Sequence, residues 1–245
     1  MSKQITTVSI FKRDSLSGKS WQFIAVAEAW VRLRKVAGQQ FFKVMGKGLD
    51  GFNPTPDWST YMHVQVWENE KVAQEYFDSS KFHNRLKEKA DDYQLIFMRN
   101  VKARGQWARK NPFEESTELD DGNPLVFVLT RARIKLTFLK RFWDYVPQSQ
   151  RDIVENEHVL FKAGVGEWPV THMATMSLWD SADAINKFAY RNKAHKNAIR
   201  QTNALQWYAE ELFSRFQPYA STGTMDQLNI ESHLKKLVTA DLTKG

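Results

Sequence analysis

Six histidines are the side chains of this 245-residue sequence best suited to bind a metal or transfer a proton, because the chain contains no cysteine. Without thiols, disulfides, iron–sulfur clusters and cysteine nucleophiles are excluded, and a haem would need histidine, tyrosine or methionine as its ligand. The histidines show no H-x-H or H-x-x-x-H spacing, so a non-haem site with clustered ligands is not indicated. The six are His63, His83, His158, His172, His195 and His233.

Two of these histidines lie in patterns that could place them in a site. In the segment 194–200, helical spacing would put His195, Ala198 and Ile199 on one apolar face, from which an imidazole can ligate a haem iron. The alternative for His195 is a packed position in the core or at a helix end. His172 begins an expected strand and could line a pocket as an acid–base group, or could simply end that strand.

Three arginines and a tryptophan are candidates for holding an anionic group. Arg104 lies close to Trp107 in a compact segment, and its planar guanidinium suits a carboxylate such as a haem propionate. Arg131 and Arg215, at or beside expected strand ends, allow the same interpretation. For each arginine the alternative is an ordinary surface position in a basic protein.

The composition narrows the class of protein. The formal net charge is +7, which favours anionic partners, but the basic residues are scattered and form no nucleic-acid-binding motif. No apolar run approaches the ~18 residues of a membrane-spanning helix, and Met1–Ile10 do not resemble a signal peptide. We therefore expect a cytoplasmic protein that does not bind nucleic acid and that could contact a membrane surface peripherally.

An internal repeat organises the chain. Trp67 recurs as Trp179, and His83 recurs as His195 at the same separation. Each half has a pattern typical of the order β-α-β-β-α-β, which is ferredoxin-like. The expected elements of the first half are 6–11, 21–36, 41–45, 60–67, 69–90 and 95–99, and those of the second are 125–130, 137–145, 159–163, 172–179, 181–204 and 212–216.

The pattern predicts an α+β fold of two tandem ferredoxin-like repeats that form a pseudo-dimeric α+β barrel. Residues 1–101 are the expected first half, and residues 124–219 are the second half, which carries the candidate haem ligand. A linker loop, 102–123, joins them, and 220–245 form a C-terminal tail. Such a scaffold serves many functions, so the fold alone decides none of them.

An ordered series of short blocks, spanning about 8–226, resembles the spheroidene monooxygenases of carotenoid biosynthesis. Each block is short, and the evidence lies in their common order along the chain. The blocks are Val8–Phe11, Gly48–Pro56, Arg104–Trp107, Leu129–Ala132, Phe161–Glu167, Ser177–Trp179, Ala198–Arg200 after His195, and Glu210–Gln217.

The resemblance implies a haem-dependent monooxygenase that uses O2 and an electron donor such as a ferredoxin on an acyclic carotenoid. It also implies kinship with haem-binding dimeric α+β barrels, in which a helix histidine ligates the iron of haem b. His195 matches that histidine. His172 and Arg215 are then the catalytic candidates. Arg104, Trp107 and Arg131 are the candidates for cofactor binding.

Two departures from the family pattern concern the substrate. Gly223-Thr224-Met225-Asp226-Gln227 replaces a Gly-Thr-Trp-Asp-Gly block, and Lys193-Ala194 stands where Gly-Pro is expected. Another apolar molecule could therefore replace the carotenoid as the substrate.

Three alternative functions stay open: a non-catalytic haem- or apolar-ligand-binding protein, peroxidase or dehydratase chemistry on the same fold, and a cofactor-free monooxygenase. A homo-oligomer is also compatible with the sequence.

Overall fold

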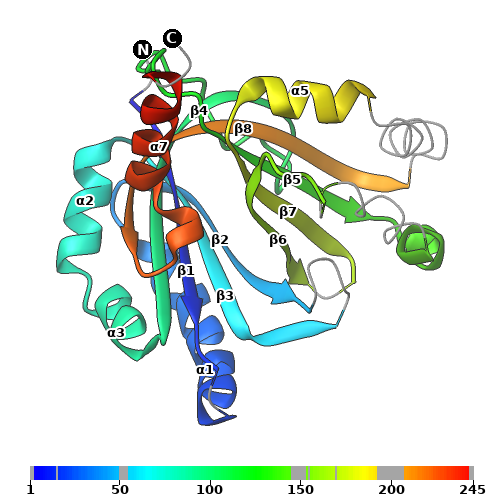
Figure 1. Ribbon diagram of the computed structural model, residues 1–245. Helices are drawn as coiled ribbons and strands as arrows, with labels where there is room; N and C mark the ends of the chain where they lie inside the picture. The colour runs from blue at the N-terminus through cyan, green and yellow to red at the C-terminus, as the bar shows by residue number, and fades with distance from the viewer. Residues whose placement is uncertain are drawn as a thin grey trace.

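A computed structural model describes residues 3–14, 16–49, 55–144, 153, 155–168, 170–191 and 207–242 (Figure 1). The strands in this part of the chain close into one antiparallel barrel, in the order β1-β3-β2-β6-β7-β5-β8-β4. They are β1 (Ile5–Lys12), β2 (Gln39–Gly48), β3 (Pro56–Trp67), β4 (Asp92–Gly105), β5 (Val126–Ile134), β6 (Val159–Trp168), β7 (His172–Trp179) and β8 (Tyr208–Gly223). The predicted α+β barrel is confirmed.

The two halves meet at two unequal seams. β4 pairs with β8 over a long register, from Gln94↔Gly223 to Gly105↔Leu212. β2 pairs with β6 only through Gly46↔Gly166 and Lys47↔Val165. The second seam closes the barrel, because it leaves neither sheet with a free edge.

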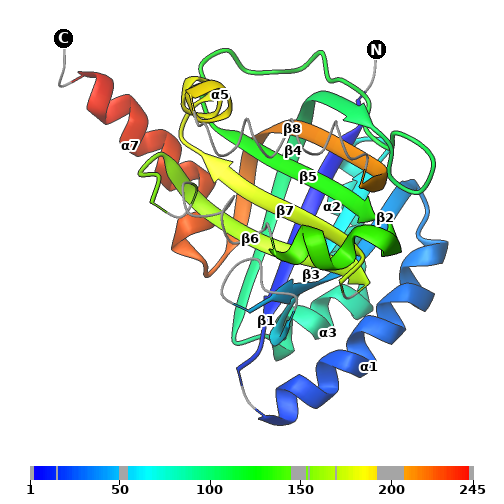
Figure 2. The ribbon, with the colours of Figure 1, turned by 90° about the vertical axis from the view of Figure 1, so that its right-hand side faces the viewer.

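The helices lie outside the barrel and cover the two halves differently (Figures 1 and 2). On the first half they are α1 (Leu16–Arg32), η1 (Leu33–Lys35), α2 (Glu70–Ser79) and α3 (Lys81–Lys89). On the second half and in the tail the described ones are η2 (Leu136–Phe138), α5 (Ala182–Arg191), η3 (Asp226–Leu228) and α7 (Ile230–Leu242). None of these helices is long and apolar enough to cross a membrane.

The helix expected over 69–90 is interrupted at Ser80. This residue has an extended backbone, and its hydroxyl accepts the N–H of His83 at 3.2 Å, so it caps α3. A serine that bonds the backbone locally competes with the continuing helix, which explains why one predicted helix is two.

Most strands are longer than the sequence predicts, and two of them run beyond the predicted halves. β4 was expected to end at residue 99 but continues to Gly105, within the predicted linker, and β8 extends to Gly223, within the predicted tail. The added ends of both strands carry many exposed or half-buried polar side chains, so they lack the apolar alternation that marks a strand. Pairing between β4 and β8 forms them, and that partner is distant in sequence.

The described residues form three hydrophobic cores, because side chains along each strand point alternately to the inside and the outside of the barrel. Inside the barrel lie Ile10, Met62, Phe127, Met176 and Phe216 with their neighbours. Aromatic residues fill the space between the first half's strands and its helices, whereas a smaller cluster of Val126, Val128, Trp179, Ala184 and Ile185 joins the second half to α5.

The C-terminal tail docks on the barrel. Leu228 and Ile230 are fully buried in the interior core. The Gln94 side chain donates to the Leu228 carbonyl at 3.0 Å, and the Glu231 carboxylate accepts from the backbone and hydroxyl of Ser221. Residues 226–231 therefore belong to the folded unit.

Candidate functional site

The second half's strands divide the predicted site residues between two faces. Successive strand residues point to opposite faces, and directly paired residues point to the same one. Arg131 and His172 point into the barrel, where Trp107 joins them, whereas Arg104 and Arg215 point outward. The structure thus brings the candidates together as two groups, not as one site.

The inward group is a buried ion cluster. Arg131 donates through Nε to Glu167 Oε1 at 3.3 Å and also pairs with Glu210. Lys43 Nζ lies 2.5 Å from the other oxygen of Glu167, and the Trp107 indole donates to Oε1 at 2.7 Å. We call these five residues the Arg131 cluster. All of them are buried or nearly so.

A strained turn after β4 completes the cluster. Gly105 has φ +100°, and a Cβ there would overlap the Glu211 carbonyl, so the position requires glycine. Ala108 and Arg109 are in the left-handed region, and their backbone N–H groups donate to Glu210 at 3.3 and 2.7 Å. Burial alone would raise the pKa of Glu210, but these bonds and Arg131 outweigh it and lower that pKa.

The cluster satisfies its own charges. Both carboxylates have counter-ions, and the Arg131 guanidinium contacts two carboxylates and the Trp107 ring, 5.9 Å away. A cofactor carboxylate at Arg131 would compete with Glu167 and Glu210 for the guanidinium. The roles predicted for Arg131 and Trp107 stay predictions, and the contacts described give both a structural function.

His172 lies half-buried at the edge of this cluster. Its Nδ1 is 2.9 Å from the Thr171 hydroxyl. Burial, followed by the charge of Arg131, lowers its pKa below the ordinary value near 6.5. The imidazole is therefore neutral at pH 7, the form that can take up a proton.

The outward face of the second half is lined by small side chains. One row across the sheet runs through direct pairs from Arg104 to Phe213, Thr130, Thr175 and Gly164. The next row is Lys102, Arg215, Val128, Ser177 and Lys162. Phe213 is 39% exposed, which is unusual for a phenylalanine in mid-strand. We call these two rows the outer face.

The arginines of the outer face lie on its β4 and β8 side. Arg104 is exposed. Arg215 is half-buried, and its Nη2 donates to the Asn186 side chain of α5 at 3.2 Å. Its Nε is buried without a hydrogen-bond partner among the described residues. An unpaired buried guanidinium N–H costs free energy and is a position where an anionic ligand would be stabilised.

The matching face of the first half is closed. Tyr61, His63 and Tyr93 lie there against the helices, and His63 and His83 are 1% and 2% exposed. His83, the repeat partner of His195, places Nε2 2.8 Å from the Tyr93 hydroxyl. In the row that corresponds to Thr130, Thr175 and Gly164, the first half carries Ser9, His63 and Val44, so a buried imidazole occupies the position of Thr175.

His195 lies outside the described residues, so its predicted role as iron ligand stays a prediction. The described residues contain no group of three or more histidine or carboxylate side chains that could hold a metal ion. Sequence reasoning missed Lys43, Glu167 and Glu210. A signal was available, because each occupies a position in register with inward apolar residues of the same strand, such as Phe41 and Met45 beside Lys43.

These features define a mixed α+β barrel protein, closed by eight antiparallel strands with helices outside. Two aldoxime dehydratase crystal structures share this fold. One aligns with a TM-score of 0.61 at 8% identity, over 93% of this chain and 86% of that one. The other, a butyraldoxime complex, has a TM-score of 0.59 at 9% identity, over 88% and 79%. Such low identity shows the fold alone.

Sequence comparison gives the family, although no protein-family model matches the chain. The spheroidene monooxygenase of Cereibacter sphaeroides is 31% identical over 222 residues, which cover 90% of this chain and 68% of that protein. That of Rhodobacter capsulatus is 29% identical over 223 residues, covering 90% and 92%. The chain belongs to the spheroidene monooxygenase family. It is therefore a monooxygenase.

Proposed function

We propose that this chain is a haem-dependent monooxygenase that inserts oxygen from O2 into an acyclic carotenoid or a similar long apolar molecule. The relatives' names support the substrate class. The outer face carries the proposal for the cofactor: a surface of threonine, glycine and one exposed phenylalanine, bordered by arginines, on the half that contains His195.

Haem b fits the chemistry of this face. Its macrocycle is flat and apolar, and the residues at the centre of this face, Thr130, Thr175 and Gly164, are small, with Thr130 exposed. Its two carboxylates suit the exposed Arg104 and the unpartnered Nε of Arg215. His195 would be the axial ligand. When bound, haem iron supplies the activation of O2 by electrons from a donor.

The chain's own residues would bind and orient the reactants. Arg104 and Arg215 would fix the cofactor's carboxylates, and Phe213 would exclude water from one of its faces. His172 is on the inward side of the sheet, so it would transfer a proton only to a group bound at that end of the barrel. The two catalytic candidates, His172 and Arg215, would thus act on different sides of the sheet.

We further infer the partners and the origin of the fold. The net positive charge of the chain would attract an acidic electron donor such as a ferredoxin. It would also attract an anionic membrane surface, which could supply a long apolar substrate.

The halves are proposed to be duplicated ferredoxin-like repeats, because the strand orders β4-β1-β3-β2 and β8-β5-β7-β6 correspond. A cytoplasmic location stays a proposal.

Replacement of His195 by alanine tests the axial ligand. We expect the variant to lose at least 90% of its bound haem, since a ligating imidazole supplies the iron–protein bond. Haem per chain is measured as the pyridine haemochrome after reconstitution with haemin. His158→Ala is the matched control, because His158 is an exposed histidine paired with Asp180. Full haem content and an unchanged Soret band in His195→Ala would refute the assignment.

Replacement of Arg215 by glutamine tests the anion contact. We expect haemin to dissociate about tenfold faster, because one charge-assisted hydrogen bond is lost. Transfer of haemin to excess apomyoglobin measures the rate. Arg133→Gln is the control, since Arg133 is an exposed arginine of β5 that is not part of the outer face. Equal rates in wild type and Arg215→Gln would contradict the placement of haem on this face.

A further inference from the structure

A cavity of about 280 Å³ opens at the barrel end opposite the Arg131 cluster. The strands that link the two ends show their separation. β2 carries Lys43 at the cluster and Lys47 at the cavity, and β6 carries Glu167 at the cluster and Phe161 at the cavity. Residues of the barrel interior line this space, which we call the mouth cavity. It is therefore distinct from the outer face.

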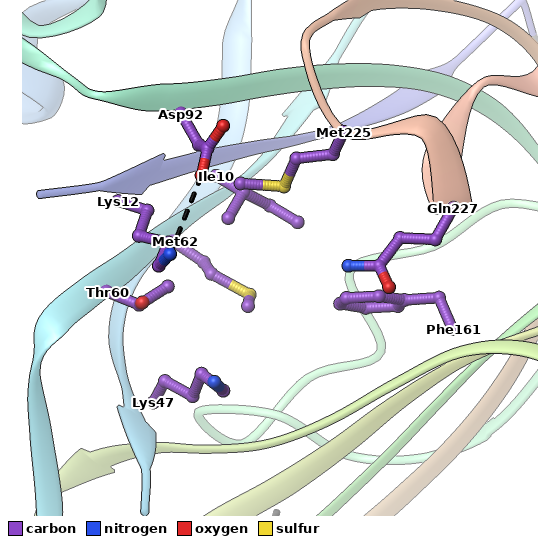
Figure 3. Close-up of a pocket in the computed structure, with 9 residues that line it drawn as sticks. All are labelled: Ile10, Lys12, Lys47, Thr60, Met62, Asp92, Phe161, Met225 and Gln227. Carbon is purple, nitrogen blue, oxygen red and sulfur yellow. Dashed lines mark ion pairs between the residues drawn. The ribbon is translucent and has the colours of Figure 1, made fainter. Parts of the chain in front are cut away.

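Four of the nine residues that line the mouth cavity are apolar. Ile10 and Met62 come from the first half, Phe161 from the second, and Met225 from the segment that follows β8. Figure 3 shows the Met62 and Met225 side chains on the same side of the space and the Phe161 ring facing them. Flexible thioethers and an aromatic ring suit a slender apolar ligand of variable shape.

One cation is available at the cavity's edge. Lys12 is paired with Asp14 at 2.9 Å and with Asp92 at 3.6 Å. The ammonium of Lys47 extends toward the space, and its partner among the described residues is Asp57, at 3.4 Å and outside the lining (Figure 3). A lysine has three N–H donors, so Lys47 can bind a further anion.

The polar side chains that line the mouth cavity favour one type of anion. Lys47 has the Gln227 amide across the cavity and no arginine in the lining. A single ammonium with one amide suits a monovalent carboxylate, whereas phosphate is usually held by several cations or by a row of backbone N–H groups. The volume lies near the lower end of the ~300–1,000 Å³ of small-molecule sites, which limits the chain length.

We propose that the mouth cavity binds a medium-chain aliphatic carboxylate. Its chain would pack between Met62, Phe161 and Met225, and its carboxylate would bind Lys47 and Gln227. The residues of the site come from both halves and from the docked tail. The site lies beside the short seam where β2 and β6 pair through two residue pairs. A ligand there would stabilise the closed barrel by binding only the folded chain. The inference is independent of haem.

Methionine methyl NMR with octanoate as the probe tests this site in the full chain. We expect saturable shifts of the Met62 and Met225 methyl signals, while Met98 and Met176, which are buried in the interior core away from the lining, stay unchanged. Lys47→Gln should weaken binding about tenfold, and 1-octanol, which lacks the charge, should bind about tenfold more weakly than octanoate.

Met225→Trp is the steric variant, because a larger ring at that position fills the cavity and should abolish the shifts. A melting temperature within a few degrees of wild type establishes that each variant folds. Absence of shifts at Met62 and Met225 up to millimolar octanoate would overturn the site. Equal affinity of wild type and Lys47→Gln would overturn its assignment to a carboxylate.

Discussion

Replacing Arg131 by methionine is expected to lower the free energy of unfolding by about 3 kcal/mol. The substitution keeps an unbranched side chain, although a shorter one, and removes the charge that Glu167 and Glu210 share inside the barrel. Glu210 would then have only backbone N–H donors among its described contacts. A buried carboxylate without a counter-ion is costly, so the loss exceeds that of a surface ion pair.

Urea denaturation at pH 7 measures this effect. Arg104→Met is the matched control, because Arg104 is exposed, and its change should stay within about 0.5 kcal/mol. Adding Glu210→Gln to Arg131→Met removes the unpaired charge and should recover part of the loss. A destabilisation below about 1 kcal/mol in Arg131→Met would contradict the interpretation of the cluster as a satisfied buried network.

Acidification is expected to destabilise the protein strongly below pH 6.5, because two histidines are buried in the first half. Burial, followed by the charge of His83, lowers the pKa of His63 to about 3. Burial, followed by the charge of Lys87, lowers the pKa of His83 to about 3. Both stay neutral in the folded chain, whereas the unfolded chain takes up protons near pH 6.5.

The difference in proton binding between the folded and unfolded states decides whether acid stabilises or destabilises the protein. Because the unfolded state binds more protons between pH 6.5 and 3, stability present above pH 6.5 is lost as the pH falls through this window. Each histidine contributes about 1.4 kcal/mol per pH unit, so the pair would remove about 5 kcal/mol between pH 6.5 and 4.5. Carboxylates add to the loss at lower pH.

His63→Phe isolates one of these contributions. Its Nε2 is buried without a hydrogen-bond partner in the part of the chain that the structure describes, and its ring already stacks on Phe82 at 6.4 Å, so phenylalanine preserves the packing. The slope of unfolding free energy against pH should fall by about half between pH 6.5 and 4.5. A slope equal to that of wild type in His63→Phe would refute the account.

Alternation and internal spacing were sufficient to predict the barrel. Strands such as β1 and β3 are rich in β-branched and aromatic residues, and the repeat of Trp67 as Trp179 indicated two similar halves. The strand ends at Lys102–Gly105 and at Tyr219–Gly223 could not be predicted, because they form through pairing between β4 and β8 and carry no local signal.

The candidate site was predicted as a set of residues but not as an arrangement. Arg104, Arg131 and Arg215 looked equivalent in the sequence, yet strand register places Arg131 inside the barrel and the other two outside. A one-residue difference in register reverses the face of a side chain, so the distinction needs the pairing itself. Glu167 and Glu210, which hold Arg131, come from different strands and were not predicted as partners.

An absorption spectrum of the purified protein, recorded with and without added haemin, tests the central claim most directly. The account predicts a Soret band that saturates at one haem per chain, shifts on reduction, shifts again with carbon monoxide, and is lost in His195→Ala. A folded protein that stays colourless and takes up no haemin would contradict the haem-dependent mechanism and favour a cofactor-free monooxygenase on the same barrel.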